Sequence, residues 1–294
     1  MGKRIVLFLI TNALVIFTVT LIVNVILPFF GIQLPPGYSG LAIFCGAFGM
    51  GGAFISLLIS RWMAKRAYKI QLITATHPDP TARQLYHTID HLAKSRGLPT
   101  PEVGIYNSPE PNAFATGPSK KSSLVAFSTG ILRKMNQREV EAVAAHEISH
   151  IANGDMVTMT LLTGIANALV MFLSRVIARL IDQAMRDDRG GGGLGFIGYY
   201  AAVFVLESVF MMLAYIPIAA FSRWREYRAD AGAARLTSPQ AMASALESLK
   251  NAVVNKAEPQ NYAMAKISSL KRVSLWATHP PLDARIKRLL QNKG

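Results

Sequence analysis

Four long apolar blocks limit what this chain can fold into more than any other feature. They cover residues 5–30, 41–59, 156–181 and 194–221. The hydrophobic content of the chain is 51%, which is high for a soluble protein, and the excess is concentrated in these blocks. Each block is about 20 residues or longer, which is the length that an α-helix needs to cross a bilayer. The sequence therefore predicts an integral membrane protein with four membrane-spanning helices.

The first two blocks predict a helical hairpin with both ends on the cytoplasmic side. A cleaved signal peptide is the competing interpretation of residues 5–30, but this apolar run is too long for a signal-peptide core and no small-x-small cleavage site closes it. Basic clusters at residues 1–4 and 61–69 flank the hairpin, and such charge marks the cytoplasmic side of a membrane. Glycines in the second block favour close helix contact: Gly46, Gly49, Gly51 and Gly52.

Nearly all of the net charge of +14 lies outside the apolar blocks. In a bacterial membrane protein this pattern follows the positive-inside rule, and no nucleic-acid-binding module accompanies it. We therefore expect no nucleic-acid partner. The single cysteine, Cys45, excludes an intrachain disulfide and a cysteine-based metal site.

Charged residues interrupt the third and fourth blocks. Arg175 and Arg179 lie late in the third block, and Glu207 lies midway through the fourth. A charge at bilayer depth usually pairs or lines a cavity. In an antiparallel hairpin, Arg175 and Glu207 fall at similar depths, so we expect them to pair. Whether both blocks span the membrane or form a re-entrant pair stays open, and the glycine-rich segment 186–193 between them is expected to be a flexible connector.

One predicted helix carries the pattern of a metal site. Asn136 serves as its N-cap, with Glu139 as the acidic half of a capping box. The motif HEISH places His146 and His150 four residues apart, so both imidazoles lie on one face and can reach one metal ion. Glu147 lies next to His146, close enough to act on a water molecule as a general base. A surface helix with two unconnected histidines is the alternative.

A third ligand is expected from the amphipathic segment 221–236. Glu226 and Asp230 lie four residues apart there, on one helical face. Glu226 would complete a His-His-Glu donor set, and Asp230 would orient a ligating histidine. A salt-bridged helix among neighbouring arginines, Arg223 included, is the alternative. Because Glu226 must share one side of the membrane with the histidines, the chain between them crosses an even number of times.

The soluble part of the chain is expected to combine helices with a small sheet. Predicted strands cover residues 101–108, 113–116 and 123–129, with a turn at 117–120. Predicted helices cover residues 80–96, 242–254 and 283–290. His87 and His91 on the first of these form a rival histidine pair, but Thr88 stands where a protease needs glutamate. We therefore expect these two histidines to be solvent-exposed.

Four motifs together resemble the HtpX group of membrane metalloproteases, gluzincins related to the CAAX prenyl endopeptidases. They are PNAFATG from residue 111, HEISHIANGD from residue 146, REYRAD from residue 225 and THPPLDAR from residue 278. The resemblance extends over nearly the full chain. It implies a protease of the bacterial inner membrane that cleaves misfolded or membrane proteins at the cytoplasmic face, in envelope quality control and stress response.

The resemblance also implies a role for individual residues. One zinc ion per chain is bound by His146, His150 and Glu226, and Glu147 is the catalytic base. Asp230 lies behind the ligands and orients them.

Two further groups of residues are implied to lie close to the catalytic centre. His279, which the following proline holds stiffly, and Arg285 are expected to stabilise the oxyanion of the reaction. An extended substrate is expected to add to an edge strand that contains Asn112, Ala113, Phe114 and Ala115.

The predicted fold class is α+β: a mainly α-helical integral membrane protein with a gluzincin-like metalloprotease domain that contains a small β-sheet. Residues 1–62 and 156–221 are expected to form two transmembrane hairpins, and residues 63–155 and 222–294 the two parts of a cytoplasmic protease domain. Both termini are expected in the cytoplasm.

The expected partners are the lipid bilayer and unfolded or membrane-embedded protein substrates, whereas the oligomeric state stays open. Two alternative functions also stay open. One is a prenyl-protein endopeptidase with the same chemistry, and the other is a non-enzymatic membrane scaffold with a structural metal.

Overall fold

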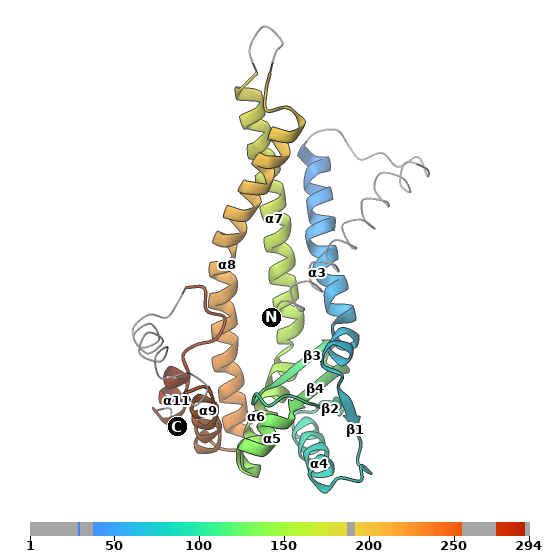
Figure 1. The fold of residues 1–294 in the computed structure, drawn as a ribbon, viewed down its shortest axis with the longest axis vertical. Coiled ribbons are helices and arrows are strands. Elements are labelled where there is room, and N and C mark those ends of the chain that lie inside the picture. The colour runs from blue at the N-terminus through green and yellow to red at the C-terminus, as the bar shows by residue number, and fades with distance from the viewer. Residues whose placement is uncertain (1–28, 30–37, 187–191, 255–274, 292–294) are drawn as a thin grey trace. The chain divides into compact units, whose positions relative to one another are not determined.

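The computed structural model describes residues 29, 38–186, 192–254 and 275–291 (Figure 1). The chain divides into two compact units, each built from two stretches of sequence. Unit 1 consists of Met1–Ser56 and Met159–Ile218, and unit 2 consists of Leu57–Thr158 and Ala219–Gly294. The predicted span at residues 5–30, apart from residue 29, and most of the connector at 186–193 lie outside the described residues.

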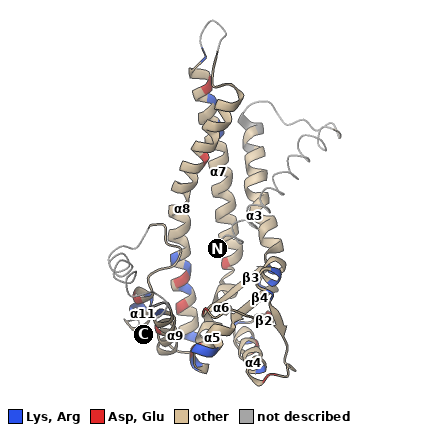
Figure 2. Cartoon of the chain, in the orientation of Figure 1, with Lys and Arg blue, Asp and Glu red and all other residues tan. Residues whose placement is uncertain are grey.

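Long helices form over the second, third and fourth apolar blocks. They are α3 (Tyr38–Tyr68), α7 (Asp155–Ala184) and α8 (Gly195–Leu236), and each contains a stretch long and apolar enough to cross a membrane. Figure 2 shows few charged residues along α3, α7 and the first part of α8. A helix satisfies its backbone hydrogen bonds internally, as the hydrocarbon core of a bilayer requires. Helix α8 runs without a break into the segment predicted to carry the third ligand, although Pro217 lies inside it.

A glycine allows α3 and α7 to approach closely within unit 1. A side-chain carbon at Gly49 would lie 2.4 Å from the backbone nitrogen of Ala168, which is closer than van der Waals contact permits. Close approach through small residues is typical of transmembrane helix pairs. The predicted contact is therefore confirmed at Gly49, whereas an added carbon at Gly46 or Gly51 would meet no atom within 4 Å.

An ion pair joins α7 and α8 within unit 1. Arg175 Nη1 donates to Glu207 Oε1 at 2.6 Å and to the carbonyl oxygen of Met171 at 3.0 Å. The predicted pairing is confirmed. It brings together two charges that would each be costly to place alone in hydrocarbon.

Charge reversal at this ion pair is expected to impair membrane insertion only when one partner is changed. Glu207→Arg places two cations opposite each other, so the amount of inserted protein should fall several-fold. Adding Arg175→Glu restores an oppositely charged pair and should restore that amount. Immunoblots of the membrane fraction, combined with protease accessibility, measure the outcome. A double variant that inserts no better than Glu207→Arg alone would show that the pair does not support insertion.

Unit 2 contains a mixed four-stranded sheet with the strand order β1-β2-β4-β3. Strands β1 and β2 are antiparallel, β2 and β4 parallel, and β4 and β3 antiparallel. Strand β3 therefore lies at an edge of the sheet. The bounds are β1 (Gln71–Ile73), β2 (Glu102–Tyr106), β3 (Ala113–Ser119) and β4 (Ser122–Ser128).

The structure confirms the three predicted strands and corrects the turn. Strand β3 does not stop at Thr116 but continues to Ser119 through an irregularity in its register with β4. Gly117 has a φ of 140° in this irregularity, and an added side-chain carbon there would lie 2.2 Å from the carbonyl oxygen of Ser122. Gly117 thus lies in a β-bulge and not in the predicted turn at 117–120. The chain reverses only at residues 120–121.

Helices pack around one apolar core with the sheet of unit 2. Ile89, Phe127, Ile148 and Leu246 are all essentially inaccessible to solvent and come from four different elements. The helices are α4 (Pro80–Ser95), α5 (Thr129–Lys134), α6 (Gln137–Asn153), α9 (Pro239–Val254) and α11 (Leu282–Gln291).

The rival histidine pair lies on the solvent-facing side of α4. His87 and His91 are both exposed, as predicted. Among the described residues, neither belongs to a group that could hold a metal ion.

Candidate metal centre

Helix α6 buries the HEISH motif within unit 2. The Asn136 side chain accepts a hydrogen bond from the Glu139 N–H at 3.0 Å, and the Glu139 carboxylate accepts one from the Asn136 N–H at 3.0 Å. This confirms the predicted capping box. The helix ends at Gly154, whose left-handed φ of 71° favours glycine. The three chemically important side chains of the motif are all buried: His146, Glu147 and His150.

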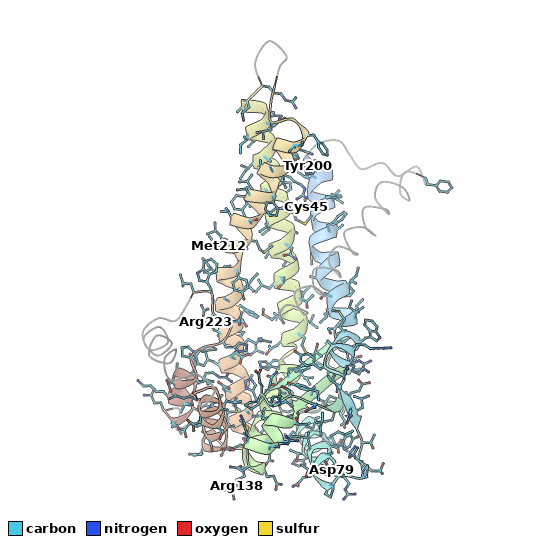
Figure 3. All side chains as sticks on the ribbon, viewed as in Figure 1. Cys45, Asp79, Arg138, Tyr200, Met212 and Arg223 are labelled. Atoms are coloured by element: carbon cyan, nitrogen blue, oxygen red, sulfur yellow. The ribbon has the colours of Figure 1, made fainter. Side chains whose placement is uncertain are left out.

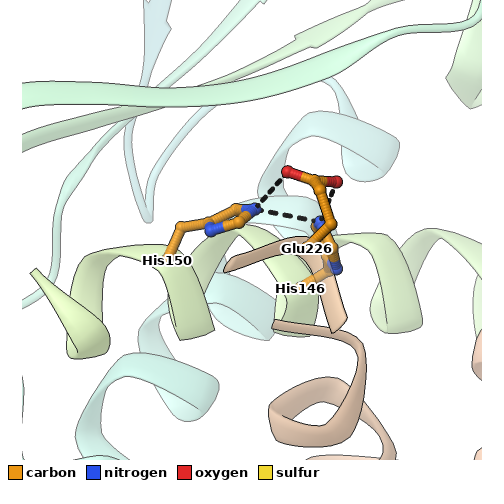
Figure 4. Close-up of side chains that lie close together, drawn as sticks. All are labelled: His146, His150 and Glu226. Carbon is orange, nitrogen blue, oxygen red and sulfur yellow. Dashed lines mark hydrogen bonds and ion pairs between the residues drawn. The ribbon is translucent and has the colours of Figure 1, made fainter. Parts of the chain in front are cut away.

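Glu226 on α8 faces the two histidines (Figure 4). The Nε2 atoms of His146 and His150 lie 3.1 Å apart. Glu226 Oε2 lies 3.6 Å from His146 Nε2, and Glu226 Oε1 lies 3.4 Å from His150 Nε2. Figure 4 shows the two imidazoles and the carboxylate converging on one another. The structure thus brings together the three predicted ligands, which are far apart in the sequence.

The spacing of these atoms fits one tetrahedral metal ion. Metal–ligand distances of about 2.0–2.1 Å and tetrahedral angles separate two ligand atoms by about 3.3 Å. The observed separations of 3.1, 3.4 and 3.6 Å lie around that value. Three protein ligands leave one coordination position open, which is a feature of catalytic rather than structural zinc sites. Within the described ranges, this is the one group of His, Cys, Asp and Glu side chains with such geometry.

Two aspartates lie close to the histidines on the side away from Glu226's contacts with their Nε2 atoms. His146 Nδ1 lies 3.0 Å from Asp230 Oδ1, and His150 Nδ1 lies 2.6 Å from Asp155 Oδ2. A carboxylate on one ring nitrogen directs the other nitrogen toward a metal. Asp230 lies where the sequence predicts an orienting residue, whereas the sequence reasoning missed Asp155. The available signal was a carboxylate five residues after the second histidine, directly beyond the helix-ending glycine.

The carboxylates also hold a proton on His146 in the absence of a metal. Burial alone would lower the pKa of His146, but the nearby carboxylates of Asp230 and Glu226 raise it to about 9. Because a ligating histidine must be neutral, a metal ion has to displace this proton. Metal affinity is therefore expected to weaken as the pH falls below that pKa.

A glycine on α8 allows Glu226 and Asp230 to reach α6. A side-chain carbon at Gly232 would lie 2.4 Å from Ser149 Oγ and 2.8 Å from Ser149 Cβ, closer than van der Waals contact permits. Ser149 is fully buried, and its hydroxyl donates to the carbonyl oxygen of Ala145 at 2.7 Å. The lack of a side chain at position 232 is what lets the two helices approach to ligand distance.

Arg285 on α11 supports the carboxylates of the site. Its Nε and Nη2 donate to the two oxygens of Asp230 at 2.8 and 2.6 Å, and its Nη1 lies 3.3 Å from Glu226 Oε2. The side chain is buried. This two-point contact fixes the Asp230 carboxylate, which in turn faces His146.

His279 lies beside the cluster on an exposed segment. Its Nδ1 is 3.1 Å from Glu226 Oε2, while 63% of its side chain is exposed. Arg223 on α8 holds this segment, because its Nη1 donates to the carbonyl oxygens of Ala277 at 2.6 Å and Leu275 at 3.3 Å. The sequence places Arg223 among the arginines of an amphipathic helix and offers no local signal for this contact.

The predicted substrate strand has one unpaired edge. Strand β3 pairs with β4 through Ala113 opposite Phe127 and Ala115 opposite Val125. No described strand lies on its other side. Such an edge presents backbone N–H and C=O groups that an extended peptide can pair with. Of the four predicted substrate contacts, Asn112 is exposed, and three are partly buried at the start of β3: Ala113, Phe114 and Ala115.

A buried His-His-Glu cluster with an adjacent glutamate, in a chain of long apolar helices, defines the class of membrane metalloproteases. Comparison with known proteins agrees with this class. The model of peptidase family M48 matches residues 79–293, and the chain belongs to this family.

Relatives and a solved structure support both the class and the fold. Proteins named Protease HtpX from Shewanella sp. (strain W3-18-1) and Shewanella oneidensis are each 47% identical over 289 residues, which cover 98% of this chain and 99% of the relative. The crystal structure of S. mikatae Ste24p is similar with a TM-score of 0.61 at 19% identity, covering 97% of this chain and 67% of that chain. The predicted fold class, mainly helical with a small sheet, is confirmed.

Proposed function

We propose that this membrane metalloprotease is a zinc-dependent endopeptidase that hydrolyses misfolded or membrane-embedded proteins at the cytoplasmic face of the bacterial inner membrane. The observation that carries the proposal is the buried cluster of His146, His150 and Glu226 with Glu147 beside it on α6. Membership of peptidase family M48 supports proteolysis. The resemblance to the HtpX group implies a place in stress response and protein quality control, and the relatives named Protease HtpX agree with that group.

One zinc ion per chain suits the donor set. Two imidazole nitrogens and one carboxylate are typical ligands of catalytic zinc. When bound, zinc supplies the Lewis acidity that polarises the scissile carbonyl and activates water. His146, His150 and Glu226 would hold the ion, while Asp230 and Asp155 keep the two imidazoles in the ligating orientation.

Glu147 is the proposed general base. It is buried, and its carboxylate makes no hydrogen bond and no ion pair within 4.0 Å to any residue that the structure describes. A carboxylate without a hydrogen bond or a close ion pair is able to take a proton from the attacking water and pass it to the leaving amine.

His279 and Arg285 take different parts in this proposal. The exposed His279 imidazole, held beside Glu226, can approach the substrate carbonyl and stabilise the oxyanion that forms there. Arg285 is buried in its two-point contact with Asp230. We therefore propose that it positions the ligands without touching substrate, which differs from the direct oxyanion role expected from the sequence.

Substrate binding is proposed at the open edge of β3. An extended peptide would pair with the backbone at Ala113 and Ala115, next to the exposed Asn112. Pairing through the backbone selects for an extended conformation rather than for particular side chains. This favours unfolded proteins of varied sequence as substrates.

The proposed membrane arrangement has four spans with both termini in the cytoplasm. Residues 1–62 and 156–221 would form two hairpins, and residues 63–155 and 222–294 the two parts of the protease domain. The basic end of α3 supports a cytoplasmic location for the second unit. There, Arg61 and Lys65 pair with Glu102 at 3.4 and 3.0 Å.

Cleavage assays with two substrate classes test this proposal. The detergent-purified full-length protein is expected to cleave an unfolded membrane protein, to lose activity with a zinc chelator, and to regain it with added zinc. A farnesylated peptide and the folded form of the same membrane protein should stay intact. Cleavage of the farnesylated peptide but not of the unfolded protein would instead favour a prenyl-protein endopeptidase. Inactivity toward both substrates with zinc bound would favour the scaffold alternative.

A further inference from the structure

Unit 1 contains a cavity that is separate from the candidate metal centre. It has a volume of about 630 Å³ and is lined by residues of α3, α7 and α8. Its lining includes the apolar residues Leu41, Phe44 and Val203. Its polar lining residues are three arginines, Asp182, Gln183, Tyr199 and Tyr200. Figure 3 shows Tyr200 near the end of the helices at which α7 and α8 are connected, in the same region as Cys45.

The charges that line this cavity do not cancel. Arg175 pairs with Glu207 at 2.6 Å, and Arg186 pairs with Asp182 at 2.7 Å. Arg179 lies between these pairs on α7, and no carboxylate among the described residues lies within 4.0 Å of its guanidinium. The cavity therefore holds one cation that the described protein groups leave without an anion.

In a bilayer, Arg179 would lie near the boundary between hydrocarbon and headgroups, because it is close to the end of α7 at Ala184. It lies four residues beyond Arg175 toward the end of α7, roughly 6 Å farther along the helix axis. Tyrosines gather at this level of a bilayer, because one end of the ring is apolar and the hydroxyl is hydrated. Tyr199 and Tyr200 lie in the first turns of α8, next to this arginine in the lining of the cavity.

We propose that this cavity binds an anionic phospholipid. Arg179 would bind the headgroup phosphate, because a guanidinium matches the geometry of phosphate oxygens. The hydroxyls of Tyr199 and Tyr200 supply further hydrogen-bond donors, and an acyl chain lies against Leu41, Phe44 and Val203. The apolar lining residues distinguish a lipid from a soluble phosphate, which would gain nothing from contact with them. The bound lipid supplies the anion that Arg179 lacks among the described residues, and it links α3 to the α7–α8 hairpin.

Thermal unfolding of the lipid-depleted, full-length protein in detergent tests this proposal. Phosphatidylglycerol is expected to raise the unfolding midpoint by several degrees, phosphatidylcholine by much less, and inorganic phosphate not at all. Arg179→Gln should remove the difference between the two lipids, whereas Arg179→Lys should keep most of it. Arg138→Gln, which changes an exposed arginine of α6 in unit 2, serves as the matched control and should respond like the native protein.

Each other outcome overturns the proposal. Equal shifts with both lipids would show that the cavity does not recognise charge, and an equal shift with inorganic phosphate would assign it to a soluble anion. An unchanged lipid preference in Arg179→Gln would show that Arg179 does not bind the headgroup. If that variant does not fold, Tyr200→Phe, at an exposed position, replaces it. Native mass spectrometry then counts the phosphatidylglycerol retained per chain, and retention equal to that of the native protein would overturn the proposal.

Discussion

Replacing Glu147 by glutamine is expected to lower kcat/KM for an unfolded protein substrate by about 10²- to 10⁴-fold, the contribution that is typical of a general base. Glutamine has nearly the shape of glutamate, but its amide cannot take the proton of the attacking water. His146, His150 and Glu226 are unchanged, so the zinc content per chain should equal that of the native protein. Cleavage rates and elemental analysis of the same preparations measure both quantities.

Two further variants sharpen this prediction. Glu141→Gln changes a partly exposed glutamate on the same helix and should leave both the rate and the zinc content unchanged. Glu147→Ala should match Glu147→Gln in rate and in zinc content. If zinc is lost together with activity in both Glu147 variants, Glu147 supports the structure of the site and is not its base.

Glu226→Gln is expected to remove both zinc and activity. The substitution takes away one of three proposed ligands and the anion that faces the histidines. It also removes the partner of Arg225 Nη2 and Arg285 Nη1, which each lie 3.3 Å from a Glu226 oxygen. Glu226 is only 2% exposed, and breaking a buried charge pair by removing one partner typically costs about 3–5 kcal/mol. The variant should therefore unfold at a lower temperature than the native protein.

A zinc titration separates the loss of metal from the loss of stability. A ligand that binds only the folded state stabilises it, so added zinc should raise the unfolding midpoint of the metal-depleted native protein. The same addition should leave Glu226→Gln unchanged. Glu247→Gln, at an exposed position of α9, serves as the control and should behave like the native protein. Stoichiometric zinc in Glu226→Gln would mean that the third ligand is another residue.

Local patterns in the sequence predict those parts of the fold that local physics determines. The apolar blocks at residues 41–59, 156–181 and 194–221 form helices, because a long apolar run has few alternatives. The capping box of Asn136 and Glu139 forms at the predicted residues, since both hydrogen bonds lie within one turn. Strand β1 escaped prediction because its three residues are too few to show a period, and pairing with β2 defines it.

In the candidate site, too, the sequence predicts what local spacing determines and misses what contacts between distant elements determine. Spacing along a helix predicts His146 with His150, and Glu226 with Asp230, and the structure brings all four together. Contacts between separate elements give three other residues their roles, and such contacts leave no periodic pattern in the sequence. These residues are Asp155, Arg223 and Gly232. The position of Gly232 illustrates this limit: its importance becomes visible only when Ser149 of α6 lies against it.

The order in which the proposed metal ligands leave the ribosome follows from their places in the chain. His146 and His150 are synthesised before α7 and the first part of α8, and Glu226 follows both. Two imidazoles alone are an incomplete donor set for a catalytic zinc ion. A nascent chain therefore completes its metal centre only after both apolar helices have emerged and are available to the membrane. An unfinished chain has only two of the three proposed ligands, so we expect it to become an active protease only late in synthesis.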